Sequence, residues 1–233
     1  AFSPIVEDGW TNVLTEAREA GIPVLCTDRL ISGADADLIV GFVGSDFYEE
    51  GRRAGNFLLK KADRMEGDPL RIVEIAGTED STPMRQRAIG FRDAIKGDPR
   101  FEIVESVSGD FLKSKGKECM QRILEERGHD IDVLYSHNDA MTLGAIEAIE
   151  AEGLTPGRDI IIITVDGEQG AIDLLKEGKI NCVVEWTPKI GDIIMSLSKK
   201  LAAGERVERY TYSAETVFTE FDENLQDIPP RGY

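Results

Sequence analysis

The sequence predicts an α/β protein with parallel, doubly wound sheets that lie between layers of helices. Short runs rich in Val, Ile and Leu alternate with segments of helical spacing along most of the 233 residues. The runs are almost continuously apolar, as strands covered on both faces are, whereas a sheet with one wet face would alternate polar and apolar residues. Both observations favour a parallel sheet over an antiparallel one.

Seven apolar runs are the predicted strands: 22–26, 38–43, 70–75, 101–107, 133–136, 160–165 and 180–186. The segments between them carry the helical period. In 140–152, Leu143, Ile146 and Ile149 form one stripe, and Gly153 suits the position just past a helix end. The matching stripe in 83–96 consists of Ala88, Phe91, Ala94 and Ile95.

The order of these elements predicts two lobes of unequal completeness. Five strands with a helix in each gap lie between residues 70 and 186, which makes a full doubly wound unit. Residues 1–45 offer one helix and about two strands, too little for an independent α/β lobe. A helix at 189–203 and an extended segment at 210–221 follow the full unit. We expect these flanking pieces to combine into a second lobe.

Composition excludes several classes of partner. Lys and Arg number 27 against 44 Asp and Glu, a net charge of −17, which disfavours nucleic acid and anionic membranes. The sequence contains no run of 18 apolar residues, so it predicts no membrane-spanning helix. No secretory leader is recognisable within these residues. Cys26, Cys119 and Cys182 are expected to be small buried hydrophobic residues.

Polar and aromatic residues follow the predicted strands at the points where they end. Ligands of open parallel sheets bind beyond the carboxyl ends of the strands, so we expect these side chains to share one edge. The residues are Asp28, Arg29, Phe111, Asn138, Asp166, Glu185 and Trp186. Planar groups with paired donors or acceptors suit neighbouring hydroxyls, and aromatic faces suit the C–H surface of a sugar ring. The edge therefore predicts a neutral polyol, most simply a monosaccharide.

All of these residues except Glu185 also have a structural explanation of their own. Asn138 or Asp139 could cap the helix that begins near residue 140, and 166–167 could be an ordinary turn. The pair 28–29 could be a local ion pair. The aromatic residues Phe111 and Trp186 could belong to the core.

The candidate motifs for catalysis or cofactor binding in this sequence are incomplete. The stretch 109–117 has six residues between its glycines and no Ser or Thr after Lys117, so it is not a phosphate-binding loop. Ser114 and Lys117 match S-x-x-K, but its companion motifs are absent. The two histidines, His129 and His137, are too few for a histidine-based metal site. We expect no metal and no cofactor.

Four stretches, 109–120, 135–160, 164–167 and 231–233, resemble the periplasmic sugar-binding proteins of ABC importers. This type I group includes ribose- and galactose-binding members, and the galactofuranose-binding members are the most similar. The resemblance implies two α/β lobes joined by crossovers near 45–46, 187–188 and 213–214, with the sugar in the cleft. The lobes would be 1–45 plus 188–213 and 46–187 plus 214–233.

The resemblance also implies ligand positions. Asp28 and Arg29 would each hydrogen-bond two hydroxyls, and Phe111 would stack on the ring. The last-strand position falls on Trp186, with Glu185 as the neighbouring candidate. The full implied set is Asp28, Arg29, Arg87, Phe111, Asn138, Asp166, Glu185 and Trp186.

Family members begin with about two further strand–helix units, so the N-terminal lobe is expected to be incomplete and to expose sheet edges and apolar surface. The implied function is capture of a monosaccharide between hinged lobes and delivery to an ABC-transporter permease, in the periplasm or outside the cell, without catalysis.

Two alternatives remain open. One is the effector-binding domain of a LacI-like transcription regulator, which shares the fold. The other is a glycoside hydrolase in which Asp28, Asp166 and Glu185 converge. Against hydrolysis, Arg29 and Arg87 are expected to keep nearby carboxylates ionised.

Overall fold

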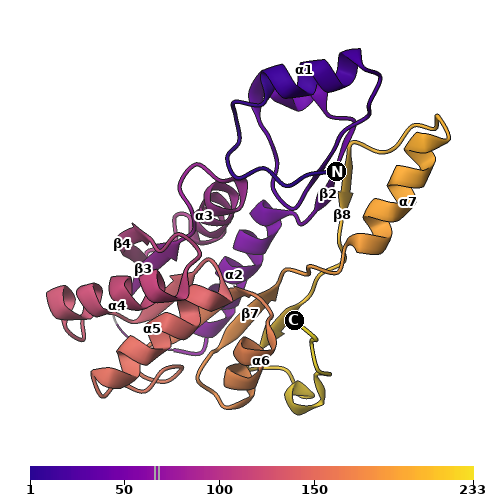
Figure 1. Ribbon diagram of the computed structural model, residues 1–233. Coiled ribbons are helices and arrows are strands. Elements are labelled where there is room, and N and C mark those ends of the chain that lie inside the picture. Colours follow the sequence, from indigo (N-terminus) through magenta and orange to yellow (C-terminus); the bar gives the residue numbers. More distant parts are fainter. Residues whose placement is uncertain (66, 68) are drawn as a thin grey trace.

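The computed structural model describes residues 1–65, 67 and 69–233 and contains two separate sheets (Figure 1). The smaller sheet has the order β1-β2-β8, from β1 (Leu25–Thr27), β2 (Gly41–Gly44) and β8 (Tyr210–Tyr212). The larger has the order β4-β3-β5-β6-β7-β9. Its strands are β3 (Leu70–Ala76), β4 (Phe101–Ser108), β5 (Val133–Ser136), β6 (Ile161–Asp166), β7 (Cys182–Glu185) and β9 (Val217–Thr219). Every pairing is parallel except β7 with β9, which confirms the predicted fold class.

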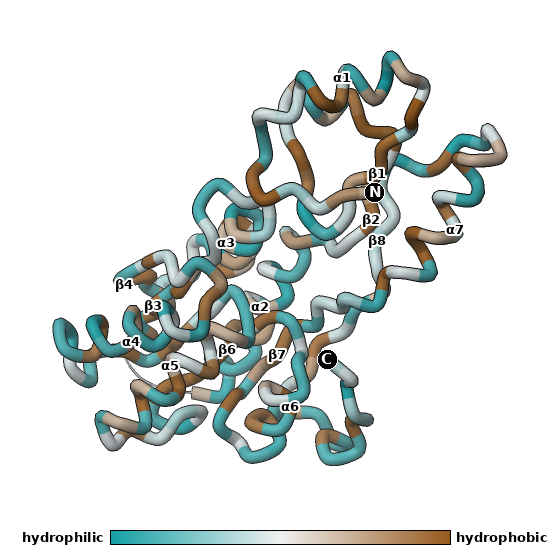
Figure 2. The backbone as a smooth tube through the Cα atoms, in the orientation of Figure 1, coloured by the Kyte–Doolittle hydropathy of each residue, from teal (hydrophilic) through white to brown (hydrophobic). Residues whose placement is uncertain are grey.

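Helices cover both faces of the larger sheet, because its strands are apolar on both sides. One face packs on α2 (Phe47–Ala62) and α3 (Thr82–Ile95) through Phe57 and Phe91. The other packs on α4 (Lys113–Arg127), α5 (Asp139–Ala151) and α6 (Gln169–Lys176). Hydrophobic residues accordingly concentrate on the central strands and on the inner sides of the helices (Figure 2).

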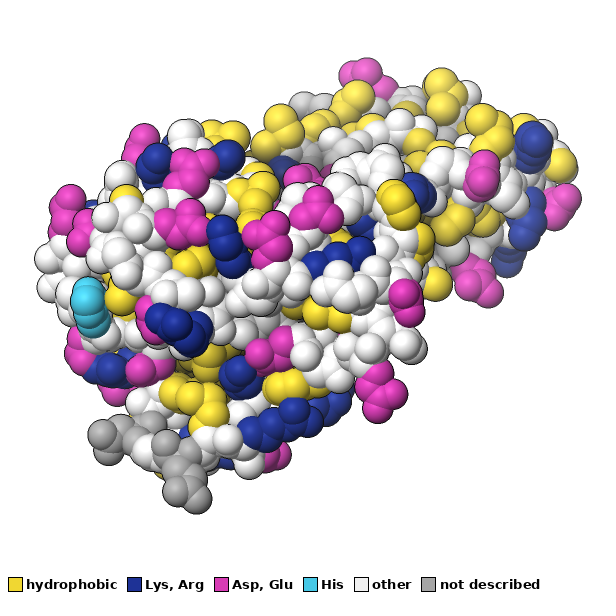
Figure 3. All heavy atoms as spheres, turned by 90° about the horizontal axis from the view of Figure 1, so that it is seen from below, with side chains coloured by type: hydrophobic (Ala, Val, Ile, Leu, Met, Phe, Trp, Pro, Cys, Tyr) yellow, Lys and Arg dark blue, Asp and Glu magenta, His cyan; other side chains and the backbone are white. Residues whose placement is uncertain are grey.

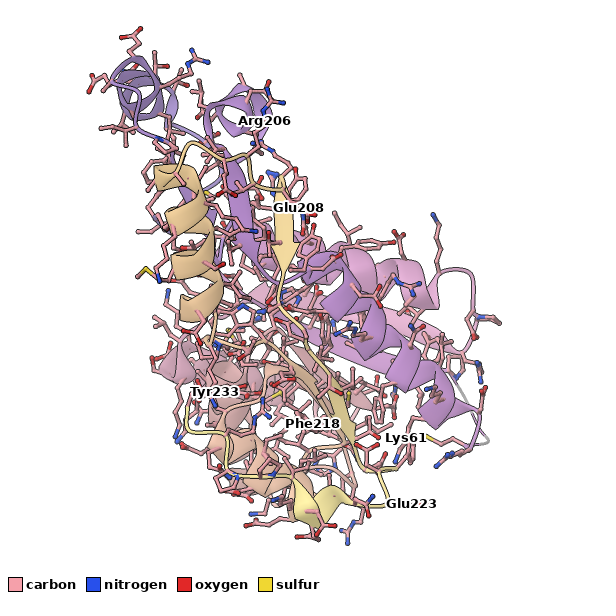
Figure 4. The ribbon with its side chains drawn as sticks, turned by 90° about the vertical axis from the view of Figure 1, so that its right-hand side faces the viewer. Lys61, Arg206, Glu208, Phe218, Glu223 and Tyr233 are labelled. Carbon is pink, nitrogen blue, oxygen red and sulfur yellow. The ribbon has the colours of Figure 1, made fainter. Side chains whose placement is uncertain are left out.

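The smaller sheet also lies between helices. On one face α1 (Thr11–Glu19) packs through Leu14. On the other, α7 (Gly191–Ala202) packs through Leu197 onto Leu25 and Val43. The predicted segment 210–221 divides between the two sheets, with β8 in the smaller and β9 in the larger, joined by a short crossover (Figure 4).

Apolar side chains are exposed mainly around the smaller sheet, as the sequence led us to expect. The narrower part of the molecule shows many of them in Figure 3. Those that belong to the elements of the smaller sheet and their flanks are Ile5, Val6, Val13, Ile22, Val40, Met195, Tyr210 and Tyr212.

Two of the predicted strands begin three residues later than predicted. Ile22 is exposed, and β1 begins only at Leu25. Leu38 ends a 3₁₀ helix, η1 (Gly33–Leu38), so β2 begins at Gly41 rather than at residue 38. Buried Asp35 ties this helix to the start of α1, because its carboxylate accepts a hydrogen bond from the Trp10 backbone N–H at 2.9 Å. This contact spans 25 residues, and local periodicity carries no trace of it.

Two of the cysteines, Cys26 and Cys182, are buried as predicted, whereas Cys119 is only half-buried. A second 3₁₀ helix, η2 (Leu225–Asp227), lies in the C-terminal tail. In the part of the chain that the structure describes, no helix is both long and apolar enough to cross a membrane.

Candidate functional site

A hollow of about 180 Å³ lies between the two sheets, at the carboxyl ends of their strands. Its lining brings together seven of the eight residues implied by the sequence, and it leaves out Glu185. The lining consists of Asp28, Arg29, Phe47, Pro83, Arg87, Phe111, Asn138, Asp166 and Trp186. The hollow is polar on several sides and has aromatic rings beside the charged groups, which is the arrangement that a hydroxylated ring requires.

The loop after β1 supplies Asp28 and Arg29. Asp28 accepts a hydrogen bond from the Ser3 hydroxyl at 3.0 Å, and Arg29 donates to the Ile5 carbonyl at 3.2 Å. Each side chain is therefore held by the N-terminal segment, which does not support the alternative of a local ion pair between them. The Arg29 guanidinium lies 5.6 Å from the centre of the Phe111 ring, so the loop reaches across to the larger sheet.

Arg87 is the most constrained polar side chain of the hollow. It is 3% exposed, and its Nε donates to Glu50 Oε2 at 2.6 Å. Its Nη1 donates to the His137 carbonyl at 2.6 Å, and its Nη2 lies 3.8 Å from Asp166 Oδ1. One rigid guanidinium thus connects α2, the end of β5 and the end of β6.

The polar run 137–139 contains three buried residues with three different tasks. Asn138 caps α5, because its Oδ1 accepts from the Met141 N–H at 3.0 Å, and it also lines the hollow. His137 Nε2 lies 3.1 Å from Glu74 Oε1, under the sheet edge. Asp139 accepts from the Gly167 and Glu168 N–H groups, each at 2.7 Å. These two hydrogen bonds of Asp139 fix the turn that carries Asp166.

Strained backbone coincides with the hollow. Among the described non-glycine residues with positive φ are Asp28 (63°), Phe111 (59°) and Asp166 (124°). Such conformations cost free energy and persist where the surrounding structure imposes them, often at binding sites. Phe111 also depends on Gly77, since a Cβ at that glycine would overlap its ring.

Glu185 does not enter the hollow. Its carboxylate forms an ion pair with Arg231 and accepts from the Thr216 N–H at 2.9 Å. It therefore secures the C-terminal tail, whose last residue, Tyr233, folds back beside the larger sheet (Figure 4). Of the two candidates at the end of this strand, Trp186 is the one that lines the hollow.

Sequence reasoning missed Phe47 and Pro83. Both lie in the first turn of a helix, α2 and α3 respectively, rather than directly after a strand. A search of helix starts next to the sheet edge would have found them. The Phe47 ring lies 5.4 Å from the Arg87 guanidinium, so it forms a wall behind that side chain.

Burial governs the ionisation of the carboxyls around Arg87. Burial raises the pKa of Asp166 well above its usual range, although Arg87 opposes this. Burial likewise raises the pKa of Asp139 to about 7, against the hydrogen bonds from Thr164 and the backbone. Burial and Arg87 therefore act in opposite directions on the pKa of Asp166, and burial is the larger effect. Across residues 1–65, 67 and 69–233, we find no group of three or more metal-ligating side chains that could hold an ion.

Comparisons with known proteins agree with this geometry. Residues 1–206 match the model of the periplasmic binding protein domain family. The chain is 38% identical over 220 residues to the galactofuranose-binding protein YtfQ of Escherichia coli K12, covering 93% of this chain and 68% of that protein.

Two solved structures are similar throughout. A Mycobacterium smegmatis protein in complex with β-D-fucofuranose has 40% identity and a TM-score of 0.92, over 100% of this chain and 75% of that one. The periplasmic binding protein of the arabinose ABC transporter from Shewanella sp. ANA-3, bound to L-arabinofuranose, has 36% identity and a TM-score of 0.90, over 97% and 73%.

YtfQ and the Shewanella protein are named as binding proteins rather than as hydrolases or regulators, so the comparisons favour the import function over both alternatives. The alignment with YtfQ covers most of the chain, and the match to the family model covers more than half of it. The chain belongs to the periplasmic binding protein domain family, as a sugar-type solute-binding protein of ABC importers.

Proposed function

We propose that this chain binds a monosaccharide in its furanose form, in the hollow between the two sheets. The observation that carries the proposal is the convergence of Arg87, Asn138 and Asp166 with the Phe111 and Trp186 rings in one space. The sugars named for three relatives, galactofuranose, β-D-fucofuranose and L-arabinofuranose, are all furanoses, which supports this ring form over the pyranose.

The chemistry of the lining suits several neighbouring hydroxyls. Asp28 and Asp166 would accept from them, and Arg29 and Arg87 would donate to them. Asn138 can do both, because its amide has a donor and an acceptor end. Hydrogen bonds to charged groups are the strong ones, and they require fixed geometry. The buried contacts of Arg87 supply that geometry before the ligand arrives.

Sugar capture would proceed by hinge closure. We place the lobes at 1–45 plus 188–213 and at 46–187 plus 214–233. The division is supported by the two sheets, because β1, β2 and β8 share the smaller sheet while β3 to β7 and β9 share the larger one. Arg29 above Phe111 is a contact between the lobes, and a sugar that touches both sides would favour the closed state.

The partner proposed for the sugar-loaded protein is the membrane permease of an ABC transporter, reached in the periplasm or at the cell exterior. Two relatives support this partner by their names, a ribose import binding protein of Haemophilus influenzae and the binding protein of the arabinose ABC transporter from Shewanella sp. ANA-3. The closed pair of lobes would present one continuous surface to the permease, and no nucleic acid or cofactor is part of this function.

The experiment is a calorimetric screen of furanose and pyranose sugars against the complete gene product that contains this chain. We expect saturable binding of at least one furanose sugar. Asp166→Asn should weaken it about 10- to 100-fold, since one acceptor oxygen facing the sugar hydroxyls is replaced by an NH₂ donor. The matched control is Asp173→Asn, an exposed carboxylate on α6 outside the hollow. Absence of binding across the screen, or equal affinity in both variants, would contradict the proposal.

A further inference from the structure

Glu50 is a buried acid that touches the hollow's arginine without lining the hollow itself. Its side chain is 1% exposed, and Oε2 accepts from Arg87 Nε at 2.6 Å. Its other oxygen, Oε1, is the only fully buried side-chain polar atom among the described residues for which no hydrogen-bond partner is found. Burying a carboxylate is costly even when it is paired with an arginine, so a buried ion pair is weak evidence for a role in fold stability.

The contacts of Arg87 show what Glu50 does. The guanidinium is a rigid planar fork, so fixing two of its nitrogens fixes the third. Glu50 occupies Nε, and the His137 carbonyl occupies Nη1. That leaves Nη2 as the nitrogen beside Asp166, with which it shares the hollow.

Close packing of α2 on α3 holds Glu50 at this distance. A Cβ at Gly51 would overlap the Arg87 carbonyl oxygen, and one at Gly90 would overlap the Tyr48 carbonyl oxygen. Both glycines therefore permit the two helix backbones to come close at the level of Glu50 and Arg87. The ion pair is therefore set by backbone contact rather than by flexible surface residues.

Glu50 also lies near the proposed crossovers. Its helix begins two residues after Ser45, whose hydroxyl donates to Glu215 in the segment between β8 and β9. Ser213 donates to the same carboxyl at 2.7 Å. Besides Arg87, three titratable groups interact electrostatically with Glu50: Glu215, Asp166 and Tyr135 on β5.

We propose that Glu50 is a positioning residue for sugar binding, which holds the Arg87 guanidinium so that Nη2 donates to the sugar. The inference rests on the proposed function. It requires Glu50 to be ionised, and burial raises the pKa of this carboxyl to about 7, against the charge of Arg87. Glu50 therefore loses its charge as the pH falls below about 7, and sugar affinity falls with it.

The test compares Glu50→Gln with Glu74→Gln in the complete gene product. Glu74 is a matched control, since its side chain is also 1% exposed and pairs with an arginine, Arg92, at 2.6 Å, but it does not line the hollow. The affinity for the best sugar of the screen is measured by calorimetry at pH 8 and pH 6, with circular dichroism to verify folding.

We expect Glu50→Gln to weaken binding at pH 8 by about 10- to 100-fold, the usual effect of removing a residue that orients a ligand-binding group. The wild-type loss of affinity between pH 8 and pH 6 should shrink in this variant, and Glu74→Gln should keep the wild-type profile. Wild-type affinity in Glu50→Gln, or an equal loss in both variants, would overturn the inference while leaving the proposed function intact. A wild-type protein that binds no sugar would contradict both the inference and the proposed function.

A measurement on the wild type alone covers the case in which Glu50→Gln does not fold. If sugar binds better to the ionised form, linkage requires that sugar binding releases protons near pH 7. Calorimetry in two buffers of different ionisation enthalpy counts these protons. Release of protons supports the proposal, and a zero count at pH 7 contradicts it.

Discussion

Asn138 combines a structural and a binding task in one side chain. Its oxygen caps α5, and its NH₂ group lies on the side of Phe111, 3.5 Å from that residue's carbonyl oxygen. Asp would also cap the helix but has no donor when ionised, whereas the amide caps with its oxygen and keeps an NH₂ group that can donate. Asn therefore suits both tasks.

Two substitutions of Asn138 separate these tasks. Asn138→Ala removes the cap and should lower the free energy of unfolding by about 1 kcal/mol, and it should also weaken sugar binding. Asn138→Asp keeps a good cap and should retain stability, yet it loses the donor and should weaken the sugar about tenfold. Denaturant unfolding and calorimetry check both. An Asp variant that binds sugar as the wild type does would show that the donor is not used.

At this scale the sequence predicts residue types better than directions. The rule that ligands lie beyond the carboxyl ends of strands brought Asp28, Phe111 and Asn138 to one edge. It could not distinguish Glu185 from Trp186, because neighbouring strand residues point to opposite sides. Only the tail that supplies Arg231 shows which of the two is already engaged.

The helix pair α2 and α3 is the element on which the hollow depends most. It supplies Phe47, Pro83 and Arg87, together with the Glu50 that holds the arginine. The apolar stripe of α3 was predictable from its spacing, since Phe91 and Ile95 are buried as expected. The buried Arg87 on that helix was not predictable from spacing, because its partner lies 37 residues earlier.

Gly51→Ala tests the helix pair. The added methyl group overlaps the backbone of α3, so we expect a loss of about 1–3 kcal/mol of unfolding free energy, as for overpacked cores. Sugar affinity should fall as well, because Arg87 is displaced.

Gly170→Ala is the control for this substitution. Gly170 lies in α6, and the nearest atom to its added methyl would be 3.7 Å away, so this variant should be as stable as the wild type or more so. Chemical denaturation measures both variants. Equal stability of the two would contradict the close packing of α2 and α3.

At the scale of the whole molecule, the hollow makes stability and binding depend on pH in opposite directions. Burial raises the pKa of Glu50 to about 7 from 4.5, and that of Asp139 to about 7 from 3.8. Between the pKa values of the unfolded chain and pH 7, the folded protein keeps protons on these carboxyls that the unfolded chain has released. The stabilising effect is therefore full below the unfolded pKa values and is lost as the pH rises through 7.

The free energy of unfolding should accordingly fall from pH 5 to pH 8, by about 2 kcal/mol or slightly more for Glu50 alone. Denaturant titrations at the two pH values measure this, and Glu50→Gln should reduce the slope. Glu74 behaves differently, because hydrogen bonds from His137 and Arg92 lower its pKa despite burial. Its contribution is present above about pH 4.5 and is lost in stronger acid. A stability that rises from pH 5 to pH 8 would contradict the raised pKa values.

The two-lobed plan was predictable from the order of elements, since the full unit at residues 70–186 and the sparse flanks differ in strand count. How the segments on either side of this unit combine was harder to predict from the sequence. The strand β8 joins a sheet whose other strands precede it by about 170 residues. Such pairing is set by tertiary contacts and leaves no periodic signal. The resemblance to a known family supplied what local patterns lacked.

The most direct test of the central claim is a crystal structure of the complete gene product with the best-binding furanose sugar. We predict one sugar in the hollow, with Arg87, Asn138 and Asp166 hydrogen-bonded to its hydroxyls and Phe111 against its ring. A sugar bound elsewhere, or a sugar in the hollow that leaves those three polar side chains without contact, would contradict the account.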